Sequence, residues 1–576
     1  MDRDMEQTRH DEFDSGRSRR DMTPVRVANE YDAGLQFNYG IDLYECVQTN
    51  ENFFIGKQWE GVQSNGLPTP VFNFLKRVVL FSVANVSTDN LKIHAKPLPS
   101  SSQLSADALE TFSNILNDQF TAIFERNKLG GKIREFTRNA AVDGDGCLYT
   151  WWDPDAETGQ ARRGAIRTEV LQNTQVLFGN PNNRDVQSQP YILIERRMLL
   201  DEAKQYAKNH GADEANIDGI TADDKEGANR QMDDLGGAKV TVLLRMWKDH
   251  RTGSVHCYEC TRTVLLRDEW DLGIKLYPIN WMPWDYVQDC YHGQAMLTGL
   301  IPNQIFVNKL FAMSMISLMT LAYPKVVYDR TKVEKWSGRV GAAIGVNGSV
   351  DGVAKIIDPA SISPQISQFI DTAISYTQKF LGASDVALGD TRPDNTSAII
   401  ALQRAAATPM ELTKQDLLQC IEELGEIYMA FMAEYYGDRF VEVRLGDDPD
   451  PYVIQFDFSM LQDIPCSIDL DAGASTYWSE IANMQTLDNL LMQGKIPTSE
   501  YLRRLPSGQI TDRENLIAVT QAAERGQMLD AAALSAGGGE TPTAAETASA
   551  PLRGGAGYGA LQRIINETGR VPRREV

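Results

Sequence analysis

The sequence has few of the residues and motifs from which enzyme active sites are commonly built. It contains 6 histidines and 7 cysteines in 576 residues. No G-x-S-x-G, H-E-x-x-H, G-x-x-x-x-G-K-[ST] or G-x-G-x-x-G motif occurs in the context that it requires. The cysteines follow no regular spacing, which excludes a disulfide framework and indicates a reducing compartment. A hydrolase that lacks these motifs is the least favoured hypothesis.

Two short motifs resemble metal sites but lack the remaining ligands. Cys257 and Cys260 lie beside His256, yet zinc needs about four ligands and no second pair lies at a suitable distance. On a strand these thiols point to opposite faces, because they are an odd number of residues apart. Asp143 and Asp145 resemble the start of a calcium loop whose later acidic ligand is missing. We therefore predict no metal, no cofactor and no catalytic residue.

Long apolar runs are also missing. The most apolar run, Leu310–Tyr323, has about fourteen residues and is shorter than the roughly 20 needed to cross a bilayer. The first residues contain no apolar stretch of the kind found in secretory signals. We therefore expect no membrane partner and a protein that stays in the cytosol where it is made.

Positive charge is scarce, because 56 basic residues face 78 acidic ones and the net charge is -22. This balance argues against a protein that wraps nucleic acid by neutralising phosphates. An acidic conduit would let a polyanion slide, although most acidic proteins have no such role. Hydrophobic residues make up 42% of the chain, as in ordinary globular proteins. The length exceeds the roughly 250–300 residues of one core, so we expect several packed units.

The first half of the chain predicts a mixed helical and strand unit that follows a polar arm and begins near Tyr31. An amphipathic helix is expected over 104–127, and the pair Gly130-Gly131 separates it from a second helix over 132–141. Strands are expected over 147–152, 175–178, 191–195, 240–247, 255–260 and 263–266.

The second half is mostly helical. Residues 294–322 are nearly all helix formers and are predicted to form a helix with apolar side chains on more than one face, so neighbours from this chain or from other copies must cover it. A helix over 366–381 is followed by a loop of about fourteen residues, which is uncommon in a compact domain unless it is functional. The longest helical pattern spans 397–436 and should kink at Pro409.

Shorter elements follow the long helix. Strands are expected over 440–445 and 452–458, and helices over 475–493 and 498–505. Residues 535–560 have the composition of a low-complexity linker.

The order of these elements, together with local motifs, resembles the portal protein family of tailed bacteriophages. The stretch Phe53-Phe54-x-Gly56-Lys57-Gln58-Trp59 followed by Pro70-Val71-Phe72-Asn73 is similar to the family's early G-x-Q-W and P-x-x-N motifs. Residues 138–146 and 176–181 are similar to its wing segments. Residues 389–402 resemble its passage from tunnel loop to tunnel helix, although Ser-Ala-Ile-Ile-Ala-Leu replaces the usual Ser-Gly-x-Ala-Leu.

The resemblance implies an α+β, multidomain subunit with an α+β wing, a helical stem, a small clip, a long kinked tunnel helix and a helical crown. The expected divisions are a flexible arm over 1–30, the wing over 31–292, the first stem helix over 293–313, the clip over 314–363, the second stem helix over 364–381, the tunnel loop over 382–396, the tunnel helix over 397–436, the wing return strands over 437–473, the crown over 474–534 and a flexible tail over 535–576.

The resemblance also implies a function. Twelve subunits would form a ring-shaped channel at one capsid vertex, through which double-stranded DNA is packaged and ejected. The expected partners are the terminase large subunit, head-completion, adaptor and tail proteins, and the major capsid and scaffolding proteins. Assembly is expected in the host cytoplasm. The alternative is another ring-forming virion protein, such as a capsid or head-completion protein.

Three groups of site residues follow from the resemblance. The channel loop would present Gly389, Asp390, Arg392, Asp394 and Asn395 to DNA, with Arg392 as the favoured single contact and a turn salt bridge as the alternative. The clip would use Lys332, Lys335 and Arg339 to meet terminase or DNA, unless they form a solvated face. Packing between subunits would involve Leu297, Ile301, Phe311, Phe369 and Ile370.

Overall fold

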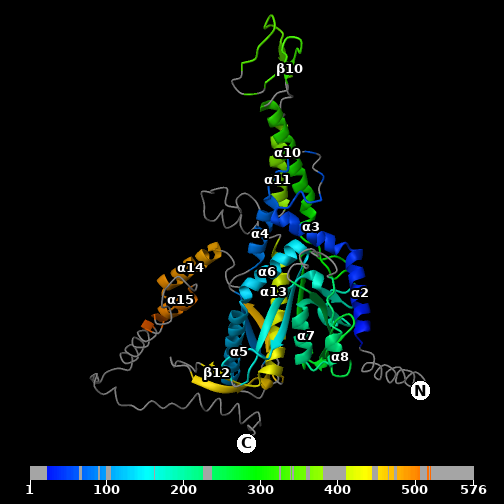
Figure 1. The fold of residues 1–576 in the computed structure, drawn as a ribbon. Helices are drawn as coiled ribbons and strands as arrows, with labels where there is room; N and C mark the ends of the chain where they lie inside the picture. The colour runs from blue at the N-terminus through cyan, green and yellow to red at the C-terminus, as the bar shows by residue number, and fades with distance from the viewer. Residues whose placement is uncertain are drawn as a thin grey trace, which may run out of the picture.

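The computed structural model describes residues 23–505 apart from 62, 64–65, 67, 88–90, 99–105, 161, 225–236, 323–325, 338, 340–342, 358–363, 381–409, 444–451, 463, 465 and 472–476, and also 516–517 and 519–520. Helices and strands are mixed throughout, which confirms the predicted α+β class. Figure 1 shows a body of helices and sheets from which a pair of helices projects, with a small strand-containing tip at their far end.

Two antiparallel sheets form the middle of the body. The smaller has the order β3-β2-β9 and the larger the order β4-β5-β6-β7-β8. Apolar side chains of both sheets meet between them, including Tyr149, Phe178, Met246 and Trp281. The strands are β2 (Asp145–Asp153), β3 (Ala165–Leu171), β4 (Val176–Phe178), β5 (Ile192–Leu199), β6 (Lys239–Lys248), β7 (Val255–Cys260), β8 (Leu265–Asp271) and β9 (Ile279–Pro283).

The six strands predicted in this region are all present, and the cysteine pair on β7 behaves as its spacing predicts. Cys257 packs in the core between the two sheets, whereas Cys260 packs on the opposite face with Tyr31 and Leu35. Both thiols are buried and their burial raises their pKa. They are therefore structural side chains of a strand.

The first helix begins earlier than the sequence pattern indicated. Helix α2 spans Pro24–Gly40, and the hydroxyl of Thr23 accepts a hydrogen bond from the backbone N–H of Arg26 at 3.3 Å. Proline suits the first turn of a helix because it has no N–H to leave unpaired. The hydroxyl of Tyr31 donates to Glu195 at 3.0 Å and joins α2 to the larger sheet. The polar residues around this helix concealed its single apolar stripe.

A second core lies among helices on the other side of the smaller sheet. Its buried side chains come mainly from α3 (Leu43–Ile55), α4 (Phe74–Val86), α5 (Ala106–Asn127), α6 (Leu129–Asp143) and α13 (Glu411–Phe431). The break between α5 and α6 falls at Lys128, whose φ of +51° is left-handed. The predicted break at Gly130-Gly131 is therefore wrong, because both glycines lie in the first turn of α6.

The remaining elements surround these cores. Two further two-stranded antiparallel sheets pair β1 (Lys92–Pro97) with β14 (Cys466–Asp471) and β12 (Asp438–Val443) with β13 (Tyr452–Asp457). Helix α13 ends in a π-helical turn, Met432–Tyr436. Helices α7 (Leu200–Asn209) and α8 (Glu214–Asp218) pack near the larger sheet, and α14 (Tyr477–Met492) and α15 (Thr498–Arg504) confirm the two last predicted helices. Pro409 and its expected kink lie outside the described residues.

A buried polar cluster joins the body to the segment that leads into the projecting helices. Asp145 is fully buried, and it accepts hydrogen bonds from the ring Nδ1 of His292 and the backbone N–H of Gly293, each at 2.7 Å. The side chain of Asn173 donates to the same carboxylate at 3.3 Å. The segment that resembles a calcium loop therefore uses Asp145 to hold the chain at the exit from the body.

Gly293 provides a test of this junction. A Cβ at this position would lie 2.5 Å from Cβ of Pro283 and 2.8 Å from the carbonyl oxygen of Asp285. Gly293→Ala should destabilise the protein by about 1–3 kcal/mol, because neither neighbour is the flexible end of a side chain. Gly130→Ala is the matched control, since nothing lies within 4 Å of its Cβ position and alanine favours a helix by about 1 kcal/mol. Urea denaturation followed by tryptophan fluorescence measures the free energy of unfolding of each variant. Equal changes in the two variants would contradict the account.

Two carboxylates flank one arginine near the same junction. Arg138 donates to both oxygens of Glu51 at 2.5 and 2.6 Å, and its guanidinium lies 3.6 Å from Asp143. Burial, and then the charge of Glu51, raise the pKa of Asp143 to about 8, although Arg138 opposes the shift. Asp143 is therefore protonated in the folded protein at neutral pH and ionised in the unfolded chain.

This proton predicts a pH dependence of stability. Because folding raises the pKa of Asp143, its contribution is complete below about pH 4 and is lost as the pH rises toward 8. Asp143→Asn keeps the shape of the neutral acid and should reduce the loss of stability between pH 5 and pH 8. Melting temperatures of the two proteins across this range measure the difference, and parallel curves would show that Asp143 does not titrate in this way.

Candidate functional site

The most distinctive feature of the molecule is the projecting hairpin, which consists of α10 (Ile301–Ala322) and α11 (Pro364–Phe380). The two helices lie side by side and carry the tip at residues 326–357 (Figure 1). The predicted order of helix, extended excursion and helix is therefore present. The first helix starts later than expected, because residue 294 forms a bridge with Asp285 and residues 298–300 form a 3-10 turn.

Side chains of the early stretch that contains Gln58 and Pro70–Asn73 contact the base of the hairpin. Asn308 of α10 donates to the side chain of Gln58 at 2.7 Å, and Gln304 donates to the carbonyl of Phe72 at 2.7 Å. The ring of Phe72 stacks on Phe311 with centroids 3.9 Å apart. The early motif therefore binds the base of α10 through hydrogen bonds and ring stacking. Its sequence did not predict this role.

The same stretch is itself held rigidly by hydrogen bonds. The indole of Trp59 donates to the carbonyl of Pro70 at 2.9 Å. The amide of Asn73 donates to the carbonyls of Phe53 and Phe54 at 3.2 and 3.0 Å, and its oxygen caps α4. These bonds tie Pro70 to Trp59 and tie Asn73 to both α3 and α4, next to the base of the hairpin.

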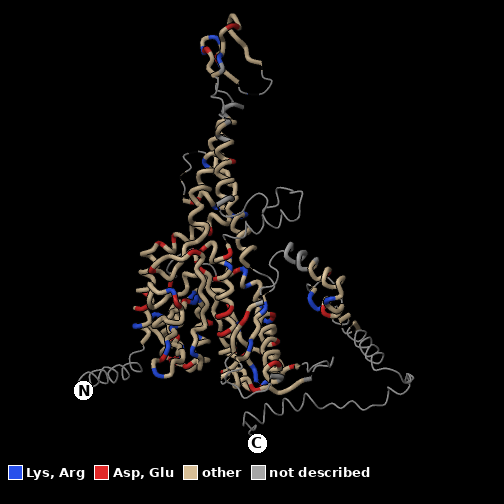
Figure 2. The backbone as a smooth tube through the Cα atoms, turned by 180° about the vertical axis from the view of Figure 1, so that it is seen from behind, with Lys and Arg blue, Asp and Glu red and all other residues tan. Residues whose placement is uncertain are grey.

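Above this base, the hairpin exposes apolar side chains and carries little charge. Its 39 helical residues include only Lys309, Asp371 and Lys379 as charged residues, and the tube in Figure 2 is mainly tan along the hairpin, whereas red and blue are frequent over the body. The exposed large apolar residues are Phe306, Met313, Met315, Leu318, Met319, Phe369 and Tyr376. Apolar surface of this extent marks an interaction site.

The residues predicted to pack between subunits differ in exposure. Leu297, Ile301 and Ile370 are buried within the single subunit, and their contact with a neighbouring subunit stays a prediction. Phe311 is half-buried against Phe72, and Phe369 is 62% exposed. The sequence pattern located the helices but could not identify the outward face, because α10 is apolar on several sides.

The tip is a small loop closed by the antiparallel pair β10 (Val326–Tyr328) and β11 (Ala354–Ile356). The ammonium group of Lys332 donates to the carbonyl of Asp351 at 3.1 Å and links the two arms. The rings of Tyr328 and Trp336 stack with centroids 5.3 Å apart.

Positive charge gathers at this tip, in contrast to the rest of the chain. Of the predicted clip residues, Lys332 is partly buried, whereas Lys335 and Arg339 are exposed. Arg330, Lys332, Lys335, Arg339 and Lys355 outnumber Asp329, Glu334 and Asp351 between residues 326 and 357. The tip is therefore basic in a chain whose net charge is -22.

The predicted channel-loop residues Gly389, Asp390, Arg392, Asp394 and Asn395 all lie outside the described residues. The first part of the long helix, over 397–409, does so as well.

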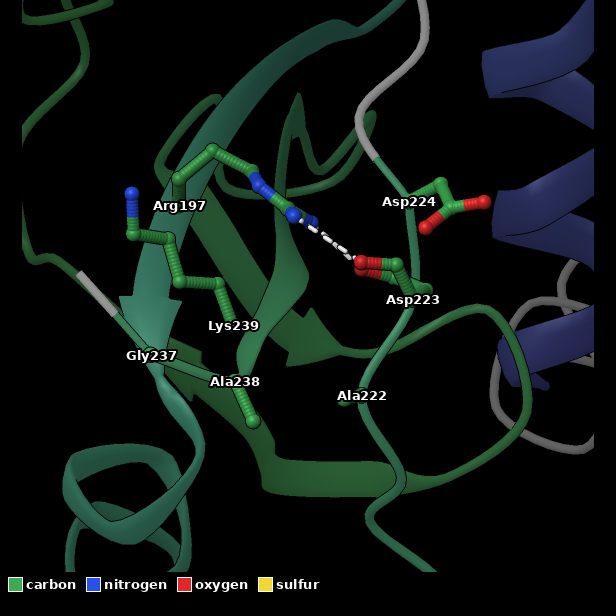
Figure 3. Close-up of a pocket in the computed structure, with 7 residues that line it drawn as sticks. All are labelled: Arg197, Ala222, Asp223, Asp224, Gly237, Ala238 and Lys239. Carbon is green, nitrogen blue, oxygen red and sulfur yellow. Dashed lines mark hydrogen bonds and ion pairs between the residues drawn. The ribbon is translucent and has the colours of Figure 1, made fainter. Parts of the chain in front are cut away.

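A polar pocket of about 210 Å³ lies elsewhere on the body, beside the larger sheet. Arg197 points toward Asp223 and forms an ion pair with it, while Asp224 and Lys239 add one charge of each sign (Figure 3). This balance gives the pocket no preference for a charged ligand.

Across the described residues, no three His, Cys, Asp or Glu side chains are grouped to hold a metal ion. Among the same described residues, no helix is both long enough and apolar enough to cross a bilayer.

Comparison with known protein families finds a match over most of the chain. The family model of phage P22-like portal proteins matches residues 41–457, which include the early motif, both sheets, the projecting hairpin and α13. No curated protein matches the chain significantly. Portal proteins are structural, non-enzymatic virion components that form rings at a capsid vertex and interact with the capsid and DNA. Since the match spans more than two thirds of its length, the chain belongs to the phage P22-like portal protein family.

Proposed function

We propose that this chain forms a closed ring of twelve copies and that double-stranded DNA enters and leaves the capsid through the central channel. The observation that carries the proposal is the exposed apolar face of the projecting hairpin, which a single subunit leaves uncovered. Contact between different faces of identical subunits generates a ring when the rotation closes. In this assignment α10 and α11 are the stem, the tip is the clip, the body is the wing, and α14 and α15 belong to the crown.

The charge of the chain supports passage of DNA in preference to retention. A polyanion moving past an acidic wall is not held by the many phosphate contacts that give tight binding. We propose that the loop with Asp390, Arg392 and Asp394 borders the channel and makes weak, salt-sensitive contact with the phosphates. Arg392 is the proposed single DNA contact.

The basic tip supports a docking role at the far end of the stem. We propose that Lys335 and Arg339 contact the terminase large subunit during packaging, and that head-completion, adaptor and tail proteins bind afterwards. The body would contact the major capsid and scaffolding proteins during assembly in the host cytoplasm. Another ring-forming virion role, such as that of a capsid or head-completion protein, is the alternative, and no observation favours it.

The ring predicts that negative charge on the exposed stem face blocks assembly. Leu318 and Met319 are 54% and 55% exposed, so the double variant Leu318→Asp, Met319→Asp should fold as a subunit. In the ring, each unpaired carboxylate would be desolvated at a cost of several kcal/mol. Mass photometry and negative-stain images should show rings for the wild type and small species for the variant. Val25→Asp is the matched control, since Val25 is an equally exposed apolar residue on α2.

Rings that form as well with the double variant as with the wild type would contradict the proposed interface. Loss of the variant's melting transition would instead report misfolding, and Leu318→Gln with Met319→Gln would then repeat the test without new charge.

The docking proposal predicts a salt-dependent effect of charge reversal at the tip. Lys335→Glu with Arg339→Glu should leave ring formation intact and weaken binding of the terminase large subunit, most strongly at low salt, because exposed charges act mainly through steering and are screened. Lys208→Glu on α7 is the control, since Lys208 is exposed on the body. Titration with the terminase large subunit at 50 and 300 mM salt measures the affinity of each protein. If the wild type and the double variant bound equally well at both salt concentrations, these residues would be excluded from the interface.

A further inference from the structure

Three arginines lie on segments that pack together near the end of α13, since α5 contacts β12 and the loop between β2 and β3 is hydrogen-bonded to β12. Arg126 lies in the last turn of α5, Arg162 lies in the loop between β2 and β3, and Arg439 lies on β12. Arg126 and Arg162 are exposed, whereas Arg439 is only 4% exposed. In the part of the chain that the structure describes, none of the three forms an ion pair with a carboxylate. In a protein with a net charge of -22, such a group of like charges requires an explanation.

Specific hydrogen bonds hold the loop that carries Arg162 against the strand that carries Arg439. The side-chain amide of Gln160 donates to the carbonyl of Phe440 and accepts from its N–H, each at 2.9 Å. Arg439 donates to the carbonyl of Gly164 at 2.8 Å. Both contacts fasten the loop between β2 and β3 onto β12. The geometry is therefore built by the fold and does not depend on flexible surface side chains alone.

Arg162, which lies between these two fastened points, reaches the backbone near Arg439. A Cβ at Gly437 would lie 2.6 Å from the Nη1 atom of Arg162. The guanidinium of Arg162 thus lies against the residue that precedes β12, two positions before Arg439. Glycine at 437 leaves the space that this guanidinium occupies.

Arg439 is the buried member and is incompletely satisfied. Its guanidinium lies 3.7 Å from the ring centroid of Tyr436 and 5.7 Å from that of Trp152. Its Nε atom is buried and has no hydrogen-bond partner. Burial lowers the pKa of Arg439, and the charges of Arg126 and Arg162 add to this shift while Tyr436 opposes it. A bound anion would offset the repulsion between these charges.

We propose that Arg126, Arg162 and Arg439 form a binding site for a phosphate group. A guanidinium presents paired N–H donors that match phosphate oxygens, and a phosphate has enough oxygens to serve several guanidinium groups, whereas a carboxylate has two. The phosphate can belong to a nucleic-acid backbone or be free in solution. The site includes a residue of β12, which lies at the opposite end of the body from the projecting hairpin (Figure 1), so it does not rest on the proposed roles of the stem and the tip.

The test uses the full chain and inorganic phosphate as the probe. Arg126→Gln with Arg162→Gln removes the two exposed charges and leaves the buried arginine and its bond to Gly164. Because each charge-assisted contact supports about a tenfold change in affinity, the double variant should bind phosphate at least tenfold more weakly by titration calorimetry. Lys208→Gln, which removes one exposed charge from α7, should bind like the wild type. All titrations are made at constant ionic strength with chloride as the balancing anion.

Arg439→Lys is a second variant that keeps the positive charge and removes the planar donor pair. It should also weaken phosphate binding, which a purely electrostatic effect of net charge would not produce. Absence of phosphate binding by the wild type, or equal binding by the wild type and the double variant, would overturn the proposal.

A second arm distinguishes the sources of the phosphate. Weaker binding of a double-stranded oligonucleotide by the double variant would assign the site to a DNA backbone, whereas unchanged DNA binding with lost phosphate binding would assign it to free phosphate. If phosphate does not bind and the variants instead change the oligomeric mass, the arginines bind a carboxylate of another copy and the proposal is wrong.

Discussion

A helical hairpin with almost no charge must cover its apolar side chains, and this requirement governs the rest of the structure. Water makes exposure of Leu318, Met319 and Phe369 unfavourable, yet the body of the same chain does not cover them. The hairpin also carries the basic tip away from the body (Figure 1). The proposed ring of subunits would satisfy both conditions, because neighbours would cover each hairpin while every tip would remain accessible at one end.

Such an arrangement requires a rigid connection between the hairpin and the body. The bonds from Gln304 and Asn308 to the early motif hold the base of α10, and Asp145 fixes the chain where it leaves the sheets. These groups are buried, so each broken bond would leave a donor or acceptor without water. Contacts within the subunit therefore fix the base of the hairpin.

Sequence patterns predicted where helices and strands lie better than they predicted which residues pack around them. Alternating β-branched and aromatic residues located the strands, and the repeat of Phe112, Leu116 and Phe120 located α5. Helix α2 was missed because its few apolar residues lie in a polar segment. The outward face of α10 could not be chosen, since burial of Leu297 and Ile301 depends on residues more than 150 positions away in the chain. The sequence could not predict the hydrogen bond from Asn308 to Gln58 or the group of arginines around Arg439. Both form between segments that are distant in the chain.

The central claim is that neighbouring copies cover the apolar face of the hairpin. An electron-microscopy reconstruction of the purified full chain tests this claim most directly. The account predicts a closed ring with a central opening, in which Leu318 and Met319 of each subunit pack against an adjacent hairpin. A particle in which these side chains face solvent, or a chain that remains monomeric at every protein and salt concentration, would contradict it.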